Sequence, residues 1–278
     1  MKNAVQRILT ALVVIPLVVG VFWLTTKYQA DWAVCLFLSV VAVVAGWEYL
    51  NLVAKLGIPL PRELFLFSAV AFLMLLVPWE GKFSLVLAWG FAYLIVMYSF
   101  FRRGAQQGFY ASLAGIFGFL YIPGMLAMVY FMYRGGFWFV LHFLLIMWGY
   151  DSGAYFVGSA LGRHRLLPRI SLAKTWEGVG GGLILAIVGA AIFPGFWQDF
   201  WSWLPHVALL GASVGAFGQL GDLFESLVKR AAGVKDTGCV FPGHGGMLDR
   251  IDSILAAAPV YVFYMHYVLN LLPLRGNP

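Results

Sequence analysis

The chain has 278 residues, of which 62% are hydrophobic and 11% are charged, against about 25% charged in an ordinary soluble domain. This composition excludes a water-soluble globular protein, which needs a polar surface on every side, and it predicts an integral membrane protein. The two cysteines, Cys35 and Cys239, provide no disulfide framework and do not have the spacing of metal ligands.

Apolar segments recur along the whole chain, and a transmembrane helix needs roughly 17–25 predominantly apolar residues. The segment that follows Lys2 and Arg7 is interpreted as a retained helix and not as a signal peptide, because it has no convincing small-residue cleavage site and further spans follow. Pro78 makes the third segment the weakest. We therefore predict an all-α, polytopic integral membrane protein with about nine transmembrane helices, near residues 8–26, 33–54, 63–78, 83–101, 109–132, 136–162, 178–194, 205–230 and 250–272.

The basic residues between these segments predict the orientation. Of the 18 Lys and Arg residues, 14 fall on one side of the predicted topology and 4 on the other. The positive-inside rule places the larger set in the cytoplasm, so we expect a cytoplasmic N-terminus and an external C-terminus. This bias accounts for most of the net charge of +6, and we therefore expect no nucleic-acid partner.

The acidic residues are distributed unevenly. Residues 1–150 contain four of the twelve, namely Asp31, Glu48, Glu63 and Glu80, and the other eight follow. We see no soluble domain and no tandem repeat. We therefore assign residues 1–135 to an N-terminal transmembrane scaffold and residues 136–278 to a C-terminal transmembrane catalytic region, within one membrane-embedded unit.

Asp151 and Asp222 are carboxylates that fall well inside predicted spans. Asp151 lies in the sixth segment and Asp222 in the eighth. A carboxylate in a bilayer is costly unless it faces a cavity or a partner, so each is a functional candidate; a structural ion pair or a protonated acid is the alternative for Asp151. Residues three, four and seven apart share a helix face, so Asp222, Glu225, Ser226 and Lys229 form a polar stripe. Such a stripe predicts a water-filled cleft that accepts a metal ion and a phosphate.

Other polar and small residues in the spans are interpreted structurally. Gly178, Gly182, Ala186 and Ala190 recur at four-residue steps, and Gly211, Gly215 and Gly218 share one face of the eighth segment. Small residues at these spacings let neighbouring helices approach closely. We expect His142 and His266, which lie within apolar segments, to be hydrogen-bonded core residues.

The connector between the sixth and seventh segments is basic, with Arg163, His164, Arg165, Arg169 and Lys174. A positive-inside loop explains part of this charge. The group Ser171, Lys174, Thr175 and Glu177 stands just before a helix, where Thr175 can serve as a cap and free amides favour an anion. This group is therefore a second candidate for substrate binding.

The stretch from Ser226 to Asp252 carries seven charged residues, and Glu225 directly precedes it. Its Pro242–Gly246 run cannot be helical, and the backbone amides of Gly245 and Gly246 can approach a phosphate. Asp249 and Asp252 share a face at the start of the next helix. Carboxylates flanked by Lys and Arg are suited to hold hydrated Mg²⁺ against a polyphosphate. The cations of this stretch are Lys229, Arg230, Lys235 and Arg250, and His244 stands among them.

This stretch resembles the signature of the phosphatidate cytidylyltransferases (CDP-diacylglycerol synthases). The matching residues are Ser226, Lys229-Arg230, Lys235-Asp236, Gly238, Phe241-Pro242-Gly243-His244-Gly245-Gly246 and Asp249-Arg250-Ile251-Asp252. The resemblance extends upstream to Gly221-Asp222, Glu225, Asp151 and Lys174-Thr175-Trp176-Glu177. It covers residues 150–253 well, whereas the first 100 residues match only in hydropathy.

The resemblance implies a reaction in which CTP and phosphatidic acid give CDP-diacylglycerol and pyrophosphate. It also implies Asp222 and Asp249 as ligands of Mg²⁺, with room for a second cation. We assign catalytic roles to Asp222, Asp249, Lys229, Lys235 and Arg250. The residues assigned to substrate binding are Asp151, Ser171, Lys174, Thr175, Glu177, Glu225, Ser226, Arg230, Asp236, His244, Gly245, Gly246 and Asp252.

The expected partners are CTP, phosphatidic acid entering from the bilayer, the membrane itself and a second copy of the chain. We expect a bacterial inner membrane, with the site facing the cytoplasm. Two alternatives stay open. A CTP-dependent kinase of lipid alcohols would use similar residues, and an ion-coupled transporter also carries intramembrane carboxylates and broken helices.

Overall fold

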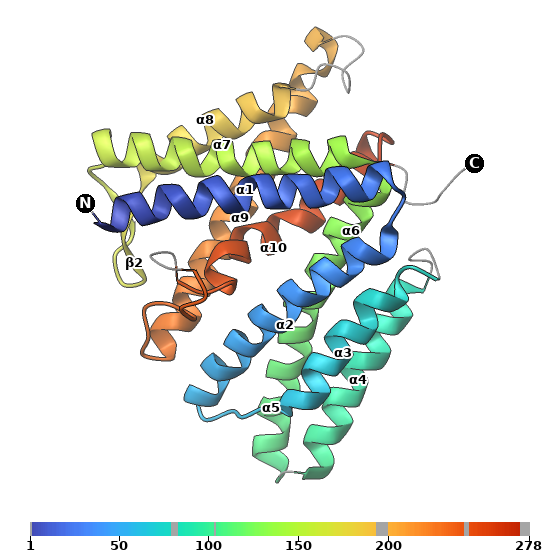
Figure 1. Ribbon diagram of the computed structural model, residues 1–278. Coiled ribbons are helices and arrows are strands. Elements are labelled where there is room, and N and C mark those ends of the chain that lie inside the picture. Colours follow the sequence, from blue (N-terminus) through green and yellow to red (C-terminus); the bar gives the residue numbers. More distant parts are fainter. Residues whose placement is uncertain (1, 79–82, 103, 193–199, 242–244, 273–278) are drawn as a thin grey trace. The chain divides into compact units, whose positions relative to one another are not determined.

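Helices make up most of the computed structural model, which describes residues 2–78, 83–102, 104–192, 200–241 and 245–272. The elements are α1 (Lys2–Lys27), α2 (Asp31–Lys55), α3 (Arg62–Leu75), α4 (Ser84–Arg102), α5 (Ala105–Phe119), the π-helix η1 (Leu120–Gly124), α6 (Met125–Gly135), α7 (Phe137–Leu161), β1 (Arg165–Leu167), β2 (Ser171–Thr175), α8 (Trp176–Ala191), α9 (Phe200–Ala231), α10 (Leu248–Phe263) and the π-helix η3 (Tyr264–Val268) (Figure 1).

Six of the described segments are long and apolar enough to cross a membrane. They are Asp31–Lys55, Ser84–Arg102, Ala105–Gly135, Phe137–Leu161, Trp201–Ala231 and Leu248–Val268. The prediction of an all-α membrane protein is therefore confirmed. Each of the nine predicted segments overlaps a helix, but α3 and α8 have only 14 and 16 residues, fewer than the roughly 20 that a span usually needs. Nine spans and a cytoplasmic N-terminus remain predictions.

Two residues account for the interruptions around α6. Pro123 has no amide hydrogen to donate, and the chain around it forms one turn of π-helix, η1. Gly136 has a φ of 121°, which a residue with a side chain rarely adopts, and it separates α6 from α7. The fifth predicted span is therefore one run, Ala105–Gly135, with a local change of helix type.

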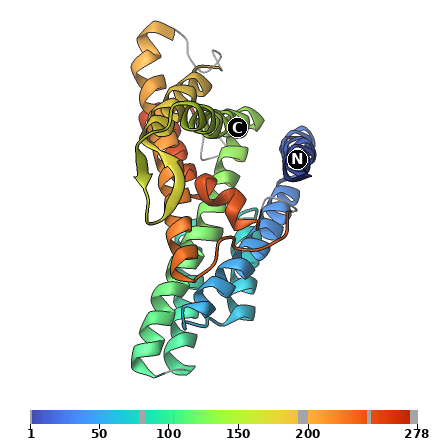
Figure 2. The same cartoon turned by 90° about the vertical axis from the view of Figure 1, so that its left-hand side faces the viewer.

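The basic connector folds as an antiparallel hairpin of β1 and β2 (Figure 2). Arg165 pairs with Thr175, and Leu167 pairs with Ser171. Directly after β2, the Thr175 hydroxyl accepts a hydrogen bond of 3.1 Å from the Gly178 amide and caps α8. The predicted cap is confirmed, and it attaches the hairpin firmly to the start of α8.

The fold divides into two compact units, Met1–Phe131 with Val228–Ile251, and Met132–Leu227 with Asp252–Pro278. In the first unit, α2 packs on α3, α3 on α4 and α4 on α5. Aromatic side chains fill its core, where the Phe119 ring contacts those of Phe65 and Phe72. These packing units differ from the predicted division at residue 135 between a scaffold and a catalytic region, which stays a prediction.

In the second unit, α7 packs on α8 along glycines. A Cβ at Gly153 would overlap the carbonyl oxygen of Gly181, so the two backbones are in direct contact. The predicted small-residue face of α8 is confirmed, since Gly178, Gly182, Ala186 and Ala190 are buried. The α9 glycines also lie against their neighbours: a Cβ at Gly211 would meet Ile187, one at Gly215 would meet Tyr150, and one at Gly218 would meet Met147.

The two histidines expected in the core are hydrogen-bonded. His142 is fully buried, and its ring nitrogens lie 3.0 Å from the Tyr261 hydroxyl and 3.0 Å from the Ala190 carbonyl oxygen. His266 is half-buried, and its Nδ1 lies 2.7 Å from the carbonyl oxygen of Leu272. Both contacts agree with the structural interpretation of these residues.

Candidate functional site

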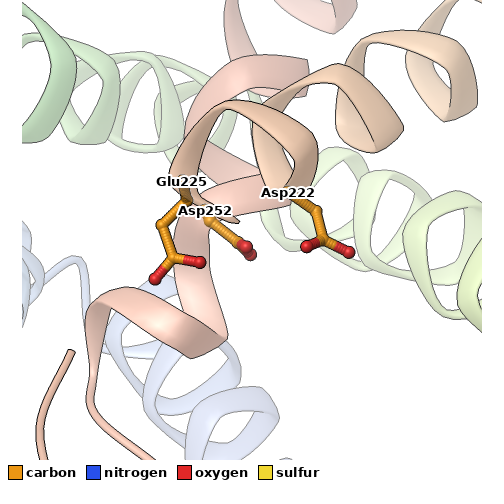
Figure 3. A group of neighbouring side chains, drawn as sticks. All are labelled: Asp222, Glu225 and Asp252. Carbon is orange, nitrogen blue, oxygen red and sulfur yellow. The ribbon is translucent and has the colours of Figure 1, made fainter. Parts of the chain in front are cut away.

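Three carboxylates converge in the second unit. Asp222 and Glu225 come from one face of α9, and Asp252 comes from α10. One oxygen of each side chain lies within 4.8 Å of the others. Figure 3 shows Asp252 between the other two. Glu225 and Asp252 are only 2% and 6% exposed.

Carboxylates at this separation repel one another when they are ionised, and burial strengthens the repulsion. A cation among them removes that cost. All three donors are carboxylate oxygens, the ligand type preferred by hard divalent cations such as Mg²⁺ and Ca²⁺. The cluster therefore offers a set of ligands that fits a divalent ion.

A lysine from the hairpin already faces this cluster. Lys174, on β2, places its Nζ 2.6 Å from Oδ2 of Asp222. The lysine side chain is 16% exposed, whereas that of Asp222 is 39% exposed. The Ser226 hydroxyl, one turn further along α9, lies 3.5 Å from Oδ1 of Asp222. The structure thus brings together Asp222, Glu225, Ser226, Asp252 and Lys174, all predicted site residues.

Glu177 holds the base of the hairpin. Its carboxylate accepts hydrogen bonds of 3.2 and 3.3 Å from the amides of Arg163 and His164, and Nδ1 of His164 lies 2.6 Å from its Oε1. The hydrogen bond from the His164 ring lowers the pKa of Glu177 to about 2. The residue that we predicted to bind substrate therefore contacts its own connector just before β1, at the base of the hairpin that carries Lys174.

A second polar cluster surrounds Asp249 in the first unit. The Asp249 side chain is 5% exposed, and its Oδ1 lies 2.5 Å from Nζ of Lys229. Its Oδ2 accepts hydrogen bonds from the Thr237 amide at 2.9 Å, from the Thr237 hydroxyl at 2.8 Å and from the Gly246 amide at 2.7 Å. One amide of the Gly245-Gly246 pair, that of Gly246, thus donates to a carboxylate of the chain itself.

Glu48, which our reading of the sequence missed, completes this second cluster. It lies on α2, is 4% exposed and accepts hydrogen bonds from Thr237, Met247 and Leu248. The sequence did contain a signal for Glu48. It is a carboxylate inside a predicted span, and the rule that singled out Asp151 and Asp222 therefore applies to it as well. The predicted division at residue 135 places its segment in the scaffold.

Several of the remaining predicted residues are exposed. Arg230, Lys235, Asp236 and Arg250 present their side chains to the exterior of the part of the chain that the structure describes, and so does Asp151 on α7. Gly245 has a φ of 78°, as expected for a turn that only glycine adopts readily. Ser171 begins β2. His244 lies outside the described residues, so its predicted role stays a prediction.

Residues 5–268 match the model of a family described as the cytidylyltransferase family. The chain belongs to the cytidylyltransferase family. The match covers both units, including the acidic cluster, the hairpin and the segment between α9 and α10.

Named relatives are similar to this chain, two of them over nearly its whole length. A phosphatidate cytidylyltransferase of Haemophilus influenzae is 33% identical over 291 residues, which cover 95% of this chain and 99% of that protein. One of Pseudomonas aeruginosa is 35% identical over 266 residues, 92% of this chain and 94% of that protein. One of Bacillus subtilis is 44% identical over 134 residues, about half of each chain. The resemblance identified from the sequence is therefore confirmed.

Proposed function

We propose that this protein transfers the cytidylyl group of CTP to phosphatidic acid, giving CDP-diacylglycerol and pyrophosphate for phospholipid biosynthesis. The proposal rests chiefly on the similarity of the chain, over 95% of its length, to a protein named for this activity. The cytidylyltransferase family model also matches residues 5–268. The site supports the proposal, because clustered carboxylates beside lysines suit a reaction between two phosphate groups.

In the proposed reaction, an oxygen of the lipid phosphate attacks the α-phosphorus of CTP. The bond from that phosphorus to the oxygen bridging it to the β-phosphorus breaks, and pyrophosphate leaves in line with the attack. The phosphate monoester of the lipid is already ionised near neutral pH, so the protein need not supply a strong base. Catalysis then depends on positioning and on neutralisation of charge.

The lysines and arginines of the site supply that neutralisation. Lys174 and Lys229 are held by Asp222 and Asp249, which fixes where their charges lie. We assign both lysines, with Lys235, Arg230 and Arg250, to the triphosphate and the lipid phosphate. Substrate binding stays the proposed role of Ser171, Thr175, Asp236, Asp151 and His244. Glu177 would act indirectly, through its contacts at the base of the hairpin.

Mg²⁺ is the proposed cofactor, and Asp222 with Glu225 and Asp252 would hold it. Asp249 stays the other predicted carboxylate ligand, and a second cation stays part of the proposal. A bound divalent ion would neutralise phosphate oxygens as negative charge shifts to the pyrophosphate. The residues fit such an ion, because every donor in the cluster is a carboxylate oxygen.

We further propose nine spans, with the N-terminus and the site on the cytoplasmic side of a bacterial inner membrane. This topology follows from the distribution of basic residues. CTP would arrive from the cytoplasm and phosphatidic acid sideways from the bilayer. Labelling of single introduced cysteines with a thiol reagent in intact cells tests this topology. We expect a cysteine introduced at residue 2 to react only after the cells are permeabilised.

The test of the reaction uses purified protein, phosphatidic acid and CTP labelled at either the α- or the γ-phosphate. We expect label from the α-phosphate to enter the lipid and label from the γ-phosphate to leave as pyrophosphate. In a parallel reaction with a lipid alcohol in place of phosphatidic acid, transfer of the γ-label into that alcohol with release of CDP would instead identify a kinase. Without lipid labelling from either CTP, the proposed function is wrong.

A further inference from the structure

Glu48 is a buried carboxylate that contacts a segment far along the chain. Its Oε1 accepts a 2.9 Å hydrogen bond from the Met247 amide, and its Oε2 accepts a 2.8 Å bond from the Leu248 amide. Oε2 also lies 2.9 Å from the Thr237 hydroxyl. The side chain is 4% exposed. One residue of α2 therefore contacts the stretch between α9 and α10 at Thr237 and Met247, and also the first residue of α10.

The amides that Glu48 accepts belong to the beginning of α10. The first turn of a helix leaves its amides without partners in the helix, and its partial positive charge favours a carboxylate. Here the carboxylate comes from a different helix and not from the residues that precede α10. The start of α10, and with it Asp249 at its second residue, is thus attached to α2.

Thr237 links the two buried carboxylates. Its hydroxyl lies 2.9 Å from Glu48 and 2.8 Å from Oδ2 of Asp249, and its amide donates to the same Oδ2 at 2.9 Å. A hydroxyl has a single proton, so its orientation depends on both carboxylates. The position of Asp249, whose other oxygen holds Lys229, is therefore coupled to Glu48.

The segment between α9 and α10 packs closely against the Glu48 carboxylate. A Cβ at Gly246 would overlap both oxygens of Glu48 and the Thr237 hydroxyl, and a Cβ at Gly238 would overlap Oε1 of Glu48. Both positions therefore require glycine for close approach. Neither Gly238 nor Gly246 has a positive φ, so backbone conformation does not explain the requirement.

We propose that Glu48 is a positioning residue for the transfer reaction: it anchors the segment between α9 and α10 and, through Thr237, orients Asp249 and its lysine. The proposal rests on the proposed function for the roles of Asp249 and Lys229. It reassigns α2 from scaffold to support of the site. Glu48 itself touches no substrate in this account.

Glu48→Gln is a sharp test, because each oxygen of Glu48 faces a backbone amide. Whichever way the new amide group is turned, its NH₂ must face a donor at Met247 or Leu248. Leaving a buried donor without an acceptor typically lowers a dependent rate or equilibrium by roughly tenfold or more. Glu63→Gln is the matched control, since Glu63 is an exposed carboxylate on the neighbouring helix α3.

The experiment compares the wild type, Glu48→Gln, Thr237→Val, the double variant of these two and Glu63→Gln in detergent. It measures CTP-dependent labelling of lipid and the rate of trypsin cleavage after Lys235, an exposed residue of the anchored segment. In Glu48→Gln we expect trypsin cleavage of this segment to be several-fold faster than in the wild type. We expect the turnover rate to be lower by roughly tenfold or more. Thr237→Val should act in the same direction, and the double variant should lose less than the two single losses combined, because both act through one contact.

Wild-type turnover in Glu48→Gln would overturn the proposal, whether or not the segment becomes easier to cleave. So would lost turnover with unchanged cleavage, because the effect would then not pass through the segment. If Glu48→Gln does not fold, Thr237→Val carries the same test. If even the wild type labels no lipid, the proposed function fails, while the cleavage rates still report whether Glu48 anchors the segment.

Discussion

Nζ of Lys174 lies 2.6 Å from Oδ2 of Asp222, which joins the strand before α8 to the carboxylate stripe of α9. The pair also faces Glu225 and Asp252, so one lysine partly offsets the charge of three carboxylates.

Replacing Lys174 tests its proposed role in neutralising phosphate. We expect Lys174→Met to lower kcat/KM by roughly 10²–10³-fold, as loss of one preorganised electrostatic donor typically does. Lys174→Arg should retain more activity, although a planar guanidinium does not replace an ammonium exactly as a point charge. Lys55→Met, at an exposed end of α2, is the control. Wild-type kinetics in Lys174→Met would remove this lysine from the reaction.

Asp222→Asn and Asp249→Asn are each expected to abolish transfer of label from CTP into lipid, because an amide neither carries charge nor replaces a carboxylate as a ligand of a hard cation. Both variants should elute from size exclusion in detergent as the wild type does. Substantial turnover in one of them would show that its carboxylate is not a metal ligand.

Removal of metal is expected to stop the reaction, and added Mg²⁺ to restore it. Binding can be followed without catalysis, because a ligand of the folded state raises the midpoint of thermal unfolding. We expect Mg²⁺ to raise that midpoint in the wild type and much less in Asp222→Asn or Asp252→Asn. Full turnover in excess chelator would contradict the metal proposal.

Glu177→Gln should loosen the hairpin that carries Lys174. An amide nitrogen cannot accept from the Arg163 or His164 amides, so cleavage by trypsin after Arg165 or Arg169 should become several-fold faster. The folded pKa of Glu177 is about 2, below the ordinary 4.5. Its contribution is therefore fully present above pH 4.5, declines as pH falls below that value and is gone once pH has fallen through about 2. An assay at pH 8 tests the charged form, and equal cleavage of both proteins there would contradict this role.

Gly153→Ala tests the packing of α7 on α8. The added methyl group overlaps the Gly181 carbonyl oxygen, and overpacking of this kind costs about 1–3 kcal/mol. Gly180→Ala is the matched control, because a Cβ there meets nothing within 4 Å. We expect a clearly lower midpoint of thermal unfolding in detergent for the first variant only. Equal midpoints would show that the helices can separate slightly at no cost.

Much of the fold is local and was readable from the sequence. Hydropathy predicted the helices, because an apolar stretch has few alternatives in a membrane. Threonine before a glycine-rich helix predicted the Thr175 cap, and the spacing of Asp222 and Glu225 predicted one shared face. The hairpin was missed, since strands of three and five residues leave little periodic signal in a basic connector.

What depends on distant residues needed the tertiary structure. Residue types and helix spacing named the carboxylates and lysines, but only the packing of α10 on α9 brings Asp252 to Asp222 and Glu225. Only the hairpin assigns Lys174 to Asp222. Glu48 meets Leu248 across 200 positions of sequence, a separation over which no helical or strand period carries information. Local periodicity specifies which face of a helix is polar, whereas the partner of that face is decided by how the helices pack.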